Sequence, residues 1–137
     1  FMILNYVLDQ QIGYQLRLAN QRHLEIFGAT FPDITPTQFS VLVRLHERGE
    51  LSQNHLGREV AMDTATVKGV VSRLKLKQWV DVGPHPTDRR RLVVSLTSEG
   101  RNYVEQAVKL AASVSKITTA NLTTQEARRL LHLLNKI

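Results

Sequence analysis

Three consecutive arginines form the stretch of this sequence with the clearest capacity for chemistry. Arg89, Arg90 and Arg91 follow Asp88, and two prolines stand just before them, at 84 and 86. Guanidinium groups form charge-assisted hydrogen bonds with phosphate oxygens, and arginine is attracted to the negative potential of a narrow DNA minor groove. We expect Asp88 to form a salt bridge with one guanidinium group, which leaves the other arginines free to meet a polyanion. The alternative is that Asp88 and the arginines only hold a turn together.

Positive charge is concentrated around the same stretch. The chain has 137 residues and a formal net charge of +6. Residues 68–91 contain seven lysines and arginines against two aspartates, which accounts for most of that excess. A basic focus of this kind favours a polyanion as partner, because binding releases counterions from phosphates. A solvated basic face without a partner would have the same composition.

Two short helices are predicted immediately before the arginines. Ser52 can cap the first, within residues 51–62, and Asp63 can cap the second, within residues 62–79. The second has an apolar stripe at helical spacing, formed by Val67, Val70, Val71 and Leu74. Its opposite face carries short polar and basic side chains, namely Thr64, Ala65, Lys68, Ser72 and Lys75. Two such helices form a helix-turn-helix, and the second helix fits the DNA major groove.

After residue 79 the hydrophobic period changes from helical to two. Val80 and Val82 indicate one short strand, and residues 91–96 alternate in a second. The segment GPHPTDRR between them is rich in turn-forming residues. A hairpin in this position is the wing of a winged helix, and its tip would lie beside the second helix, near the minor groove.

Longer helices flank this central region. Residues 8–29 are predicted to form one helix with apolar residues on more than one side, which favours burial against a second subunit. The alternative is one edge of a monomeric bundle. Capping signals mark three more helices: Thr35, Pro36 and Gln38 at the start of residues 36–48, Thr97 before a helix that ends near residue 121, and Thr123 with Glu126 before a final amphipathic helix.

Two segments resemble the MarR family of bacterial transcription regulators. They are LSQNHLGREVAMDTATVKGVVSRLKLKQWV, residues 51–80, and GPHPTDRRRLVVSLTSEG, residues 83–100. The second is similar to the family's wing pattern, with an arginine-rich tip, an alternating strand and an LTxxG sequence that opens the next helix. The chain departs from it in having three arginines where many relatives have two basic residues. Another departure is Gly69 inside the second short helix, where a glycine would allow the close approach of another backbone.

The resemblance implies a mainly α fold with a small two- to three-stranded antiparallel β wing. It implies a helical dimerisation region (residues 1–32 and 97–137) and a winged helix-turn-helix lobe (residues 33–96) that binds DNA. A homodimer of this kind reads a pseudo-palindromic operator, with the two recognition helices about 34 Å apart. The resemblance also implies repression of a nearby operon that is relieved by a small aromatic acid.

The candidate DNA-binding residues lie on three elements. On the second short helix, Lys68 is expected to contact guanine or phosphate, and the hydroxyl groups to contact phosphates. Arg73 binds phosphate or forms an internal salt bridge. Arg90 is the leading minor-groove residue by the resemblance, whereas Arg91 starts the strand and can pack along it. The full set is Gln53 at the start of the first short helix, Thr64, Thr66, Lys68, Ser72 and Arg73 on the second, and Arg89, Arg90 and Arg91 in the hairpin.

An effector pocket is expected only from the resemblance. It would lie between the first helix, the helix at 36–48 and the start of the helix at 97. Four side chains in these segments can meet a carboxylate or phenol: Tyr14, Arg17, His23 and His46. Each is also an ordinary surface or core residue.

Other classes of function have little support in the sequence. There is no cysteine, and the five histidines lack the spacing of a zinc site, so no metal and no cofactor are expected. Catalytic motifs are absent from the sequence, and an enzyme is not expected. A module that binds RNA or a protein partner is the alternative. No apolar run is long enough to cross a bilayer, and we expect a cytoplasmic, nucleoid-associated protein. We also expect residues 1–4 to be a fragment of a longer N-terminus.

Overall fold

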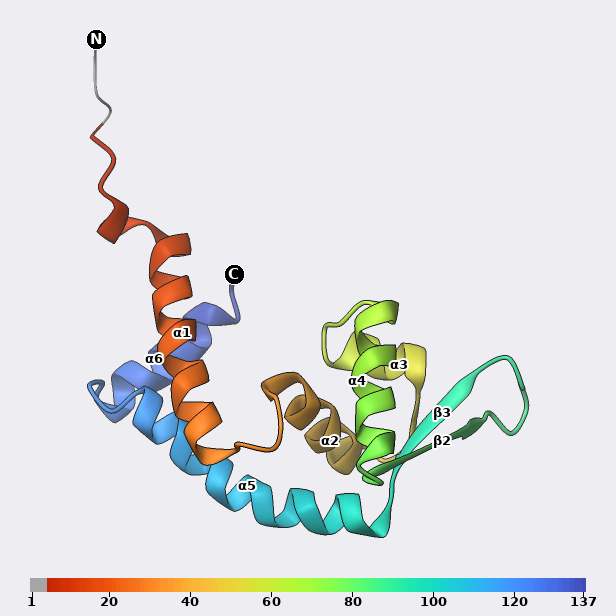
Figure 1. Ribbon diagram of the computed structural model, residues 1–137. Coiled ribbons are helices and arrows are strands. Elements are labelled where there is room, and N and C mark those ends of the chain that lie inside the picture. Colours follow the sequence, from red (N-terminus) through yellow and green to blue (C-terminus); the bar gives the residue numbers. More distant parts are fainter. Residues whose placement is uncertain (1–4) are drawn as a thin grey trace. The chain divides into compact units, whose positions relative to one another are not determined.

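The computed structural model describes residues 5–137, and the expectation for residues 1–4 lies outside them. The chain divides into two compact units. Residues 31–111 form the winged unit, and residues 5–30 with 112–137 form the helical unit. Figure 1 shows the order of the elements along the chain.

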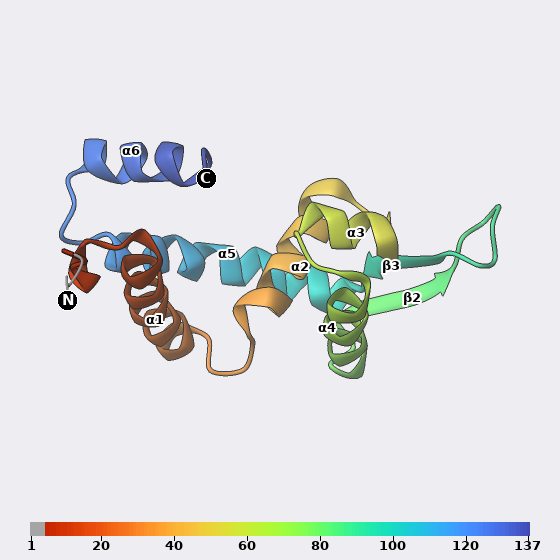
Figure 2. The ribbon, with the colours of Figure 1, turned by 90° about the horizontal axis from the view of Figure 1, so that it is seen from above.

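The winged unit contains the two short helices and the hairpin. Its elements are α2 (Pro36–Arg48), β1 (Leu51–Ser52), α3 (Gln53–Glu59), α4 (Thr64–Leu76), β2 (Val80–Pro84), β3 (Leu92–Leu96) and the first part of α5 (Ser98–Thr118). Figure 2 shows α3 and α4 as separate short helices next to the two longer strands. The predicted mainly α fold with a small antiparallel sheet is confirmed, and the sheet has three strands in the order β1-β3-β2.

Side chains cap the helices where the sequence predicts them. Thr35 and Gln38 form the capping box of α2. Ser52 Oγ accepts a hydrogen bond from the backbone N–H of His55 at 3.2 Å, which starts α3. Asp63 Oδ1 accepts one from the backbone N–H of Thr66 at 2.7 Å, which starts α4. Each bond satisfies a backbone donor that the first helical turn leaves unpaired.

The core of the winged unit collects the predicted apolar stripes. Val67, Val70, Val71 and Leu74 of α4 are all buried. They lie with Leu42 and Leu45 of α2, Leu56 of α3, Val80 and Val94 of the sheet, and Val104 and Ala107 of α5, which are also buried. Because this stripe turns inward, the opposite face of α4 is held toward solvent.

The hairpin is longer and its turn shorter than predicted. Pro84 pairs with Leu92, so β2 extends to Pro84 and β3 begins at Leu92 rather than at Arg91. The turn therefore covers residues 85–91. Pro84 is tolerated there because it lies at the end of an edge strand, where its missing N–H costs no ladder bond.

The helical unit contains α1 (Ile12–Thr30), the end of α5 and α6 (Thr124–Leu134), preceded by a 3₁₀ turn, η1 (Leu8–Gln10). The prediction of one helix over 8–29 is wrong, because Gln11 is extended and separates η1 from α1. Side-chain amides cap the break: Gln11 Nε2 donates to Val7 O at 2.9 Å, and Gln15 Nε2 donates to Asp9 O at 2.7 Å.

The end of α5 and the start of α6 lie close to their predicted positions. Helix α5 ends at Thr118, three residues before the expected end, and Thr119 Oγ1 donates to Ser115 O at 2.8 Å in the turn that follows. Thr123 and Glu126 form the predicted capping box of α6. None of the helices in residues 5–137 is long and apolar enough to cross a membrane.

Candidate nucleic-acid interface

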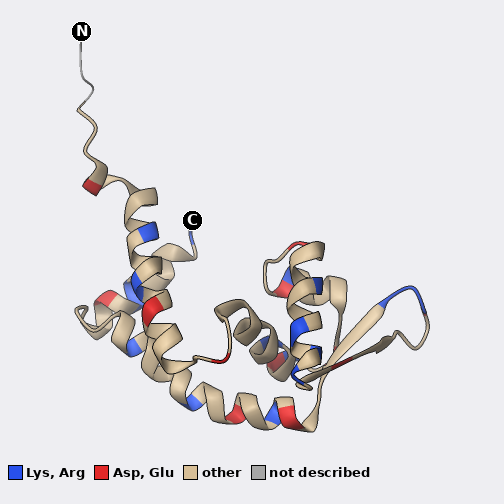
Figure 3. Cartoon of the chain, in the orientation of Figure 1, with Lys and Arg blue, Asp and Glu red and all other residues tan. Residues whose placement is uncertain are grey.

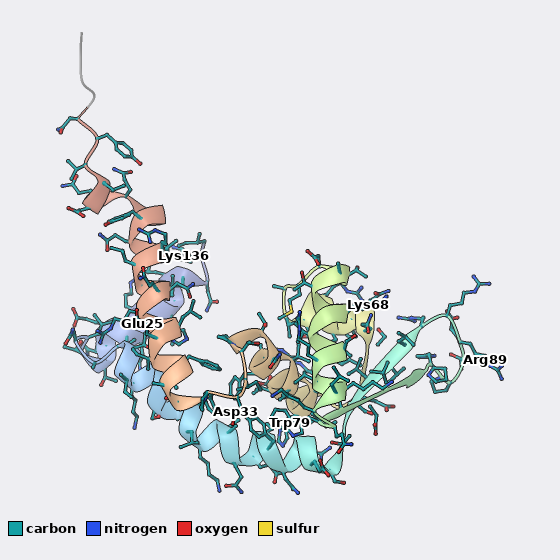
Figure 4. All side chains as sticks on the ribbon, in the orientation of Figure 1. Glu25, Asp33, Lys68, Trp79, Arg89 and Lys136 are labelled. Carbon is teal, nitrogen blue, oxygen red and sulfur yellow. The ribbon has the colours of Figure 1, made fainter. Side chains whose placement is uncertain are left out.

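The outer face of α4 is polar and exposed, as predicted. Thr64, Thr66, Lys68, Ser72 and Arg73 are all exposed. Figure 4 labels Lys68 on this helix, on the winged unit. At the start of α4, hydrogen bonds from the Thr66 backbone and side chain hold the pKa of the Asp63 carboxyl below its usual range.

The turn of the hairpin carries the arginine run. Figure 3 shows in blue the part of this turn that adjoins β3, and further basic positions along α4. Arg89, Arg90 and Arg91 are exposed. None of the three forms an ion pair with another residue of the described chain, and neither does Arg73. Their positive charges are therefore not neutralised within the part of the molecule that the structure describes.

Asp88 does not make the contact predicted for it. Its Oδ1 accepts a hydrogen bond from the backbone N–H of Arg90 at 3.0 Å, and its carbonyl oxygen accepts one from the backbone N–H of Arg91 at 3.0 Å. Within residues 5–137 the carboxylate forms no ion pair with a guanidinium group. The reason is local, since an aspartate at the start of a turn binds the backbone two residues later. Asp88 shapes the turn and leaves all three guanidinium groups free.

His85 and Thr87 also shape the turn, a role that the sequence does not predict. His85 Nδ1 accepts a hydrogen bond from the backbone N–H of Thr87 at 3.2 Å and lies 3.1 Å from Thr87 Oγ1. The backbone N–H of His85 donates to Arg91 O at 2.9 Å, which closes the base of the turn. A histidine followed two residues later by threonine is a weak signal, because the ring must first be folded back onto the chain.

Gln53 lies at the start of α3 and is half-buried. The structure brings it to the wing, where it lines a small cavity with Arg90 and Arg91. Because β1 pairs with β3, residues almost forty positions apart in the sequence meet here.

The four candidate effector residues divide between the two units. Tyr14, Arg17 and His23 lie on α1 in the helical unit, and His46 lies on α2 in the winged unit. The Arg17 guanidinium lies 5.4 Å from the centre of the Tyr14 ring, and His23 Nδ1 shares a hydrogen bond of 2.8 Å with Thr118 Oγ1. His46 Nε2 lies 3.6 Å from Glu105 Oε1.

An apolar cavity of about 490 Å³ lies within the helical unit. Its lining includes His23 among apolar side chains of α1 and α6, such as Leu16, Leu130, Leu131 and Leu134. No pattern in the sequence predicts this cavity. In the described part of the chain, no group of three or more His, Asp or Glu side chains could hold a metal ion.

Comparison with known proteins agrees with this geometry. A sequence model of the MarR family matches residues 34–92, which cover α2 through the hairpin turn. The HTH-type transcriptional repressor NicR of Pseudomonas putida is 37% identical over 134 residues, which are 96% of this chain and 85% of that protein. The chain belongs to the MarR family.

Two solved structures of regulators are similar to this MarR-family chain over nearly its whole length. BpsR of Bordetella bronchiseptica, studied for the regulation of its DNA binding by 6-hydroxynicotinic acid, is 38% identical with a TM-score of 0.91, over 96% of this chain and 95% of that one. A MarR variant of Escherichia coli complexed with operator DNA is 29% identical with a TM-score of 0.85, over 91% of each chain.

The MarR family resemblance, the fold class and the regulatory function expected from the sequence are thereby confirmed. The chain is a DNA-binding transcriptional regulator with a winged helix-turn-helix. Members of the MarR family are regulators that bind DNA without catalysing a reaction. The comparisons favour this function and give no support to the alternative of a module for RNA or a protein partner.

Proposed function

We propose that two copies of this chain bind one pseudo-palindromic operator, repress a nearby operon, and leave the DNA when a small aromatic acid binds. The observation that carries the proposal is the basic surface of the winged unit. Exposed side chains of α4 and three arginines without ion pairs in the described chain share that unit. Such a surface suits a duplex, because α4 fits the major groove and the wing reaches the adjacent backbone or minor groove.

In this proposal α4 is the recognition helix. Lys68 contacts a base edge or a phosphate, and Thr64, Thr66, Ser72 and Arg73 contact the backbone. Their exposure and the buried stripe behind them support these roles.

The wing supplies the second set of contacts. Arg89, Arg90 and Arg91 approach the duplex beside α4, and Arg90 is the leading candidate for the minor groove. The turn bonds of Asp88 support this role, because they fix the backbone while leaving the guanidinium groups exposed.

Dimerisation uses the terminal helices, residues 1–32 and 97–137, and DNA binding uses residues 33–96. Helix α6 has no buried residue. Leu131 in this helix is 65% exposed, and Ile137, which follows the helix, is 84% exposed. Soluble monomers rarely expose so much contiguous apolar surface. A second copy would cover it and place two recognition helices on one face of the duplex.

For the effector we propose a small aromatic or heteroaromatic acid. The regulation of DNA binding by 6-hydroxynicotinic acid in the similar protein BpsR supports this class. Tyr14, Arg17, His23 and His46 are the candidate contacts, since a cation, a phenol and two imidazoles can meet a carboxylate and a ring hydroxyl.

In this proposal the chain catalyses no reaction and uses no cofactor. It acts in the cytoplasm, in association with the nucleoid.

Selection of bound sites from random duplexes tests the proposal. We expect a palindrome whose half-sites lie about one helical turn apart. Fluorescence anisotropy at stated salt should then give tighter binding to that duplex than to a scrambled duplex or to single-stranded RNA of equal length. Equal affinity for all three would overturn the proposal. Titration of the complex with 6-hydroxynicotinic acid, with the non-aromatic cyclohexanecarboxylic acid as the control, tests the effector class.

A further inference from the structure

A cavity of about 100 Å³ lies where the wing meets the start of α3. It is lined by Ser52, Gln53 and Asn54 on one side and by Arg90, Arg91 and Leu92 on the other. The sheet creates it, because Leu51 pairs with Val94 and Ser52 pairs with Val93. This pairing brings the chain that enters α3 alongside the residues that precede β3.

The lining of this cavity is rich in hydrogen-bond donors and contains no acid. Gln53 and Asn54 carry side-chain amides, and the two arginines carry guanidinium groups. Ser52 Oγ already accepts from the backbone N–H of His55, which leaves its hydroxyl hydrogen to donate outward. Donors on both walls and a positive charge on one wall select an anion.

The backbone groups of Arg90 and Arg91 already have hydrogen-bond partners within the turn. The N–H of Arg90 donates to Asp88 Oδ1, and the N–H of Arg91 donates to Asp88 O. Arg91 O accepts from the N–H of His85. Because these bonds hold the main chain, the side chains of Arg90 and Arg91 provide the free donors on the wing side.

We propose that this cavity receives a single phosphate of the DNA backbone, held by Gln53 and Asn54 of α3 and by Arg91 of the wing together. The inference rests on the proposed function and deepens it. The wing and α3 then act as one clamp on the same phosphate group. The clamp leaves Arg90 for the minor groove, and Arg89, which does not line the cavity, also stays available there.

A double-mutant cycle tests the clamp. Anisotropy with the selected operator would compare Gln53→Ala, Arg91→Ala and the double variant, after circular dichroism has shown equal folding. Each single change should weaken binding about tenfold. The double change should weaken it far less than the product of the two, because the second change removes a partner of a phosphate already released. The matched control pair is Gln53→Ala with Arg89→Ala, whose losses should multiply.

Replacing single phosphates with uncharged methylphosphonates provides a second readout. One position in each half-site should weaken the wild-type protein strongly and the Gln53→Ala, Arg91→Ala double variant only slightly. Multiplicative losses in the Gln53–Arg91 cycle, or a methylphosphonate profile equal for wild type and double variant, would overturn the clamp while leaving DNA binding established. A wild-type protein that ignores every duplex would instead remove the proposed function itself, and the clamp with it.

Discussion

Individual side chains of α4 and the wing differ in what they are expected to contribute to binding. Lys68 is exposed on the face opposite the buried stripe, and its ammonium group is a compact point charge. Lys68→Ala should cost about 1–3 kcal/mol of binding free energy if it reads a base edge, and the loss should be specific to one base pair. Anisotropy with a set of operators that differ at single positions measures this. A loss of the same size on every sequence would reassign Lys68 to a phosphate.

Arg90 tests the wing at the same scale. Arg90→Ala should weaken operator binding and lower the dependence of affinity on salt, because one fewer counterion is released. The fold should survive, since the Asp88 bond to residue 90 uses the backbone N–H. Arg90→Lys is the control that keeps the charge and loses the planar fork. Unchanged operator affinity for Arg90→Ala would contradict the role.

Tyr103 provides a pH-dependent signal inside the winged unit. Its ring stacks on Trp79 with centroids 4.0 Å apart, and burial, with a smaller effect of the Asp33 carboxylate, raises its pKa above the usual 10.0. The raised pKa favours the neutral phenol in the folded protein. Its stabilising effect is therefore complete below about pH 10 and is lost as the pH rises through the folded-state pKa.

Trp79 is the single tryptophan, so its fluorescence reports this titration. We expect quenching with a midpoint above pH 10 as the stacked phenol ionises. Tyr103→Phe keeps the stack and should remove the titration. A midpoint at or below 10 in the folded protein would show that the phenol is not desolvated as the structure has it. Figure 4 labels Trp79 and Asp33 in this region.

At the scale of elements, replacing Gly69 in α4 is expected to affect the stability of the fold and DNA binding in opposite directions. A Cβ at this position would lie 3.7 Å from the Arg73 guanidinium, which is ordinary contact distance. Gly69→Ala should therefore stabilise the fold by up to about 1 kcal/mol, the difference in helix propensity. If Gly69 is present because DNA approaches the helix closely, the same variant should bind the operator more weakly. Thermal unfolding and anisotropy on one preparation measure both, and unchanged affinity would exclude a close approach.

Gly100 is expected to respond in the opposite way. A Cβ there would collide with the carbonyl oxygen of Trp79 and lie 2.9 Å from its carbonyl carbon. The start of α5 cannot move away freely, because Thr97 Oγ1 donates to Gln78 O at 2.7 Å and the N–H of Thr97 donates to Trp79 O at 3.1 Å. Gly100→Ala should lower the free energy of unfolding by about 1–3 kcal/mol, with Gly69→Ala as the matched control. Equal melting temperatures for Gly100→Ala and wild type would show that the start of α5 can move away from Trp79 without cost.

The elements that the sequence predicts are those with local signals. Thr35, Ser52 and Asp63 cap helices through bonds to residues three positions away, and the α4 stripe follows from its period. Left-handed backbone at Ala61 and Gln78 has no glycine to signal it, and both turns depend on the packing around them. The two-residue β1 exists only because β3 is there to pair with it. The cavity between Gln53 and Arg91 depends on that pairing, so no local sequence pattern predicts it.

At the scale of the whole molecule, function depends on two copies acting together. Apolar side chains on α1 and α6 are exposed in the single chain, among them Ile12 at 68% and Leu131 at 65%. If the second copy covers them, as proposed, their burial would contribute roughly 25 cal/mol for each Å² of apolar surface removed from water. A dimer also converts the second half-site contact into an intramolecular event, which raises affinity for a palindrome without new contacts.

Leu131→Glu should therefore dissociate the dimer and weaken binding to the full operator. A charge at this position would have to be desolvated in the interface, which is costly without a partner. Light scattering should give twice the 15.6 kDa of one chain for wild type and a single-chain mass for the variant. Leu76→Glu is the matched control, since Leu76 is 85% exposed but lies on α4 in the winged unit, and it should stay dimeric. The Leu131→Glu protein should bind an isolated half-site as well as wild type does, because its winged unit is unchanged. If Leu131→Glu remains a dimer with full operator affinity, the subunits join through another surface.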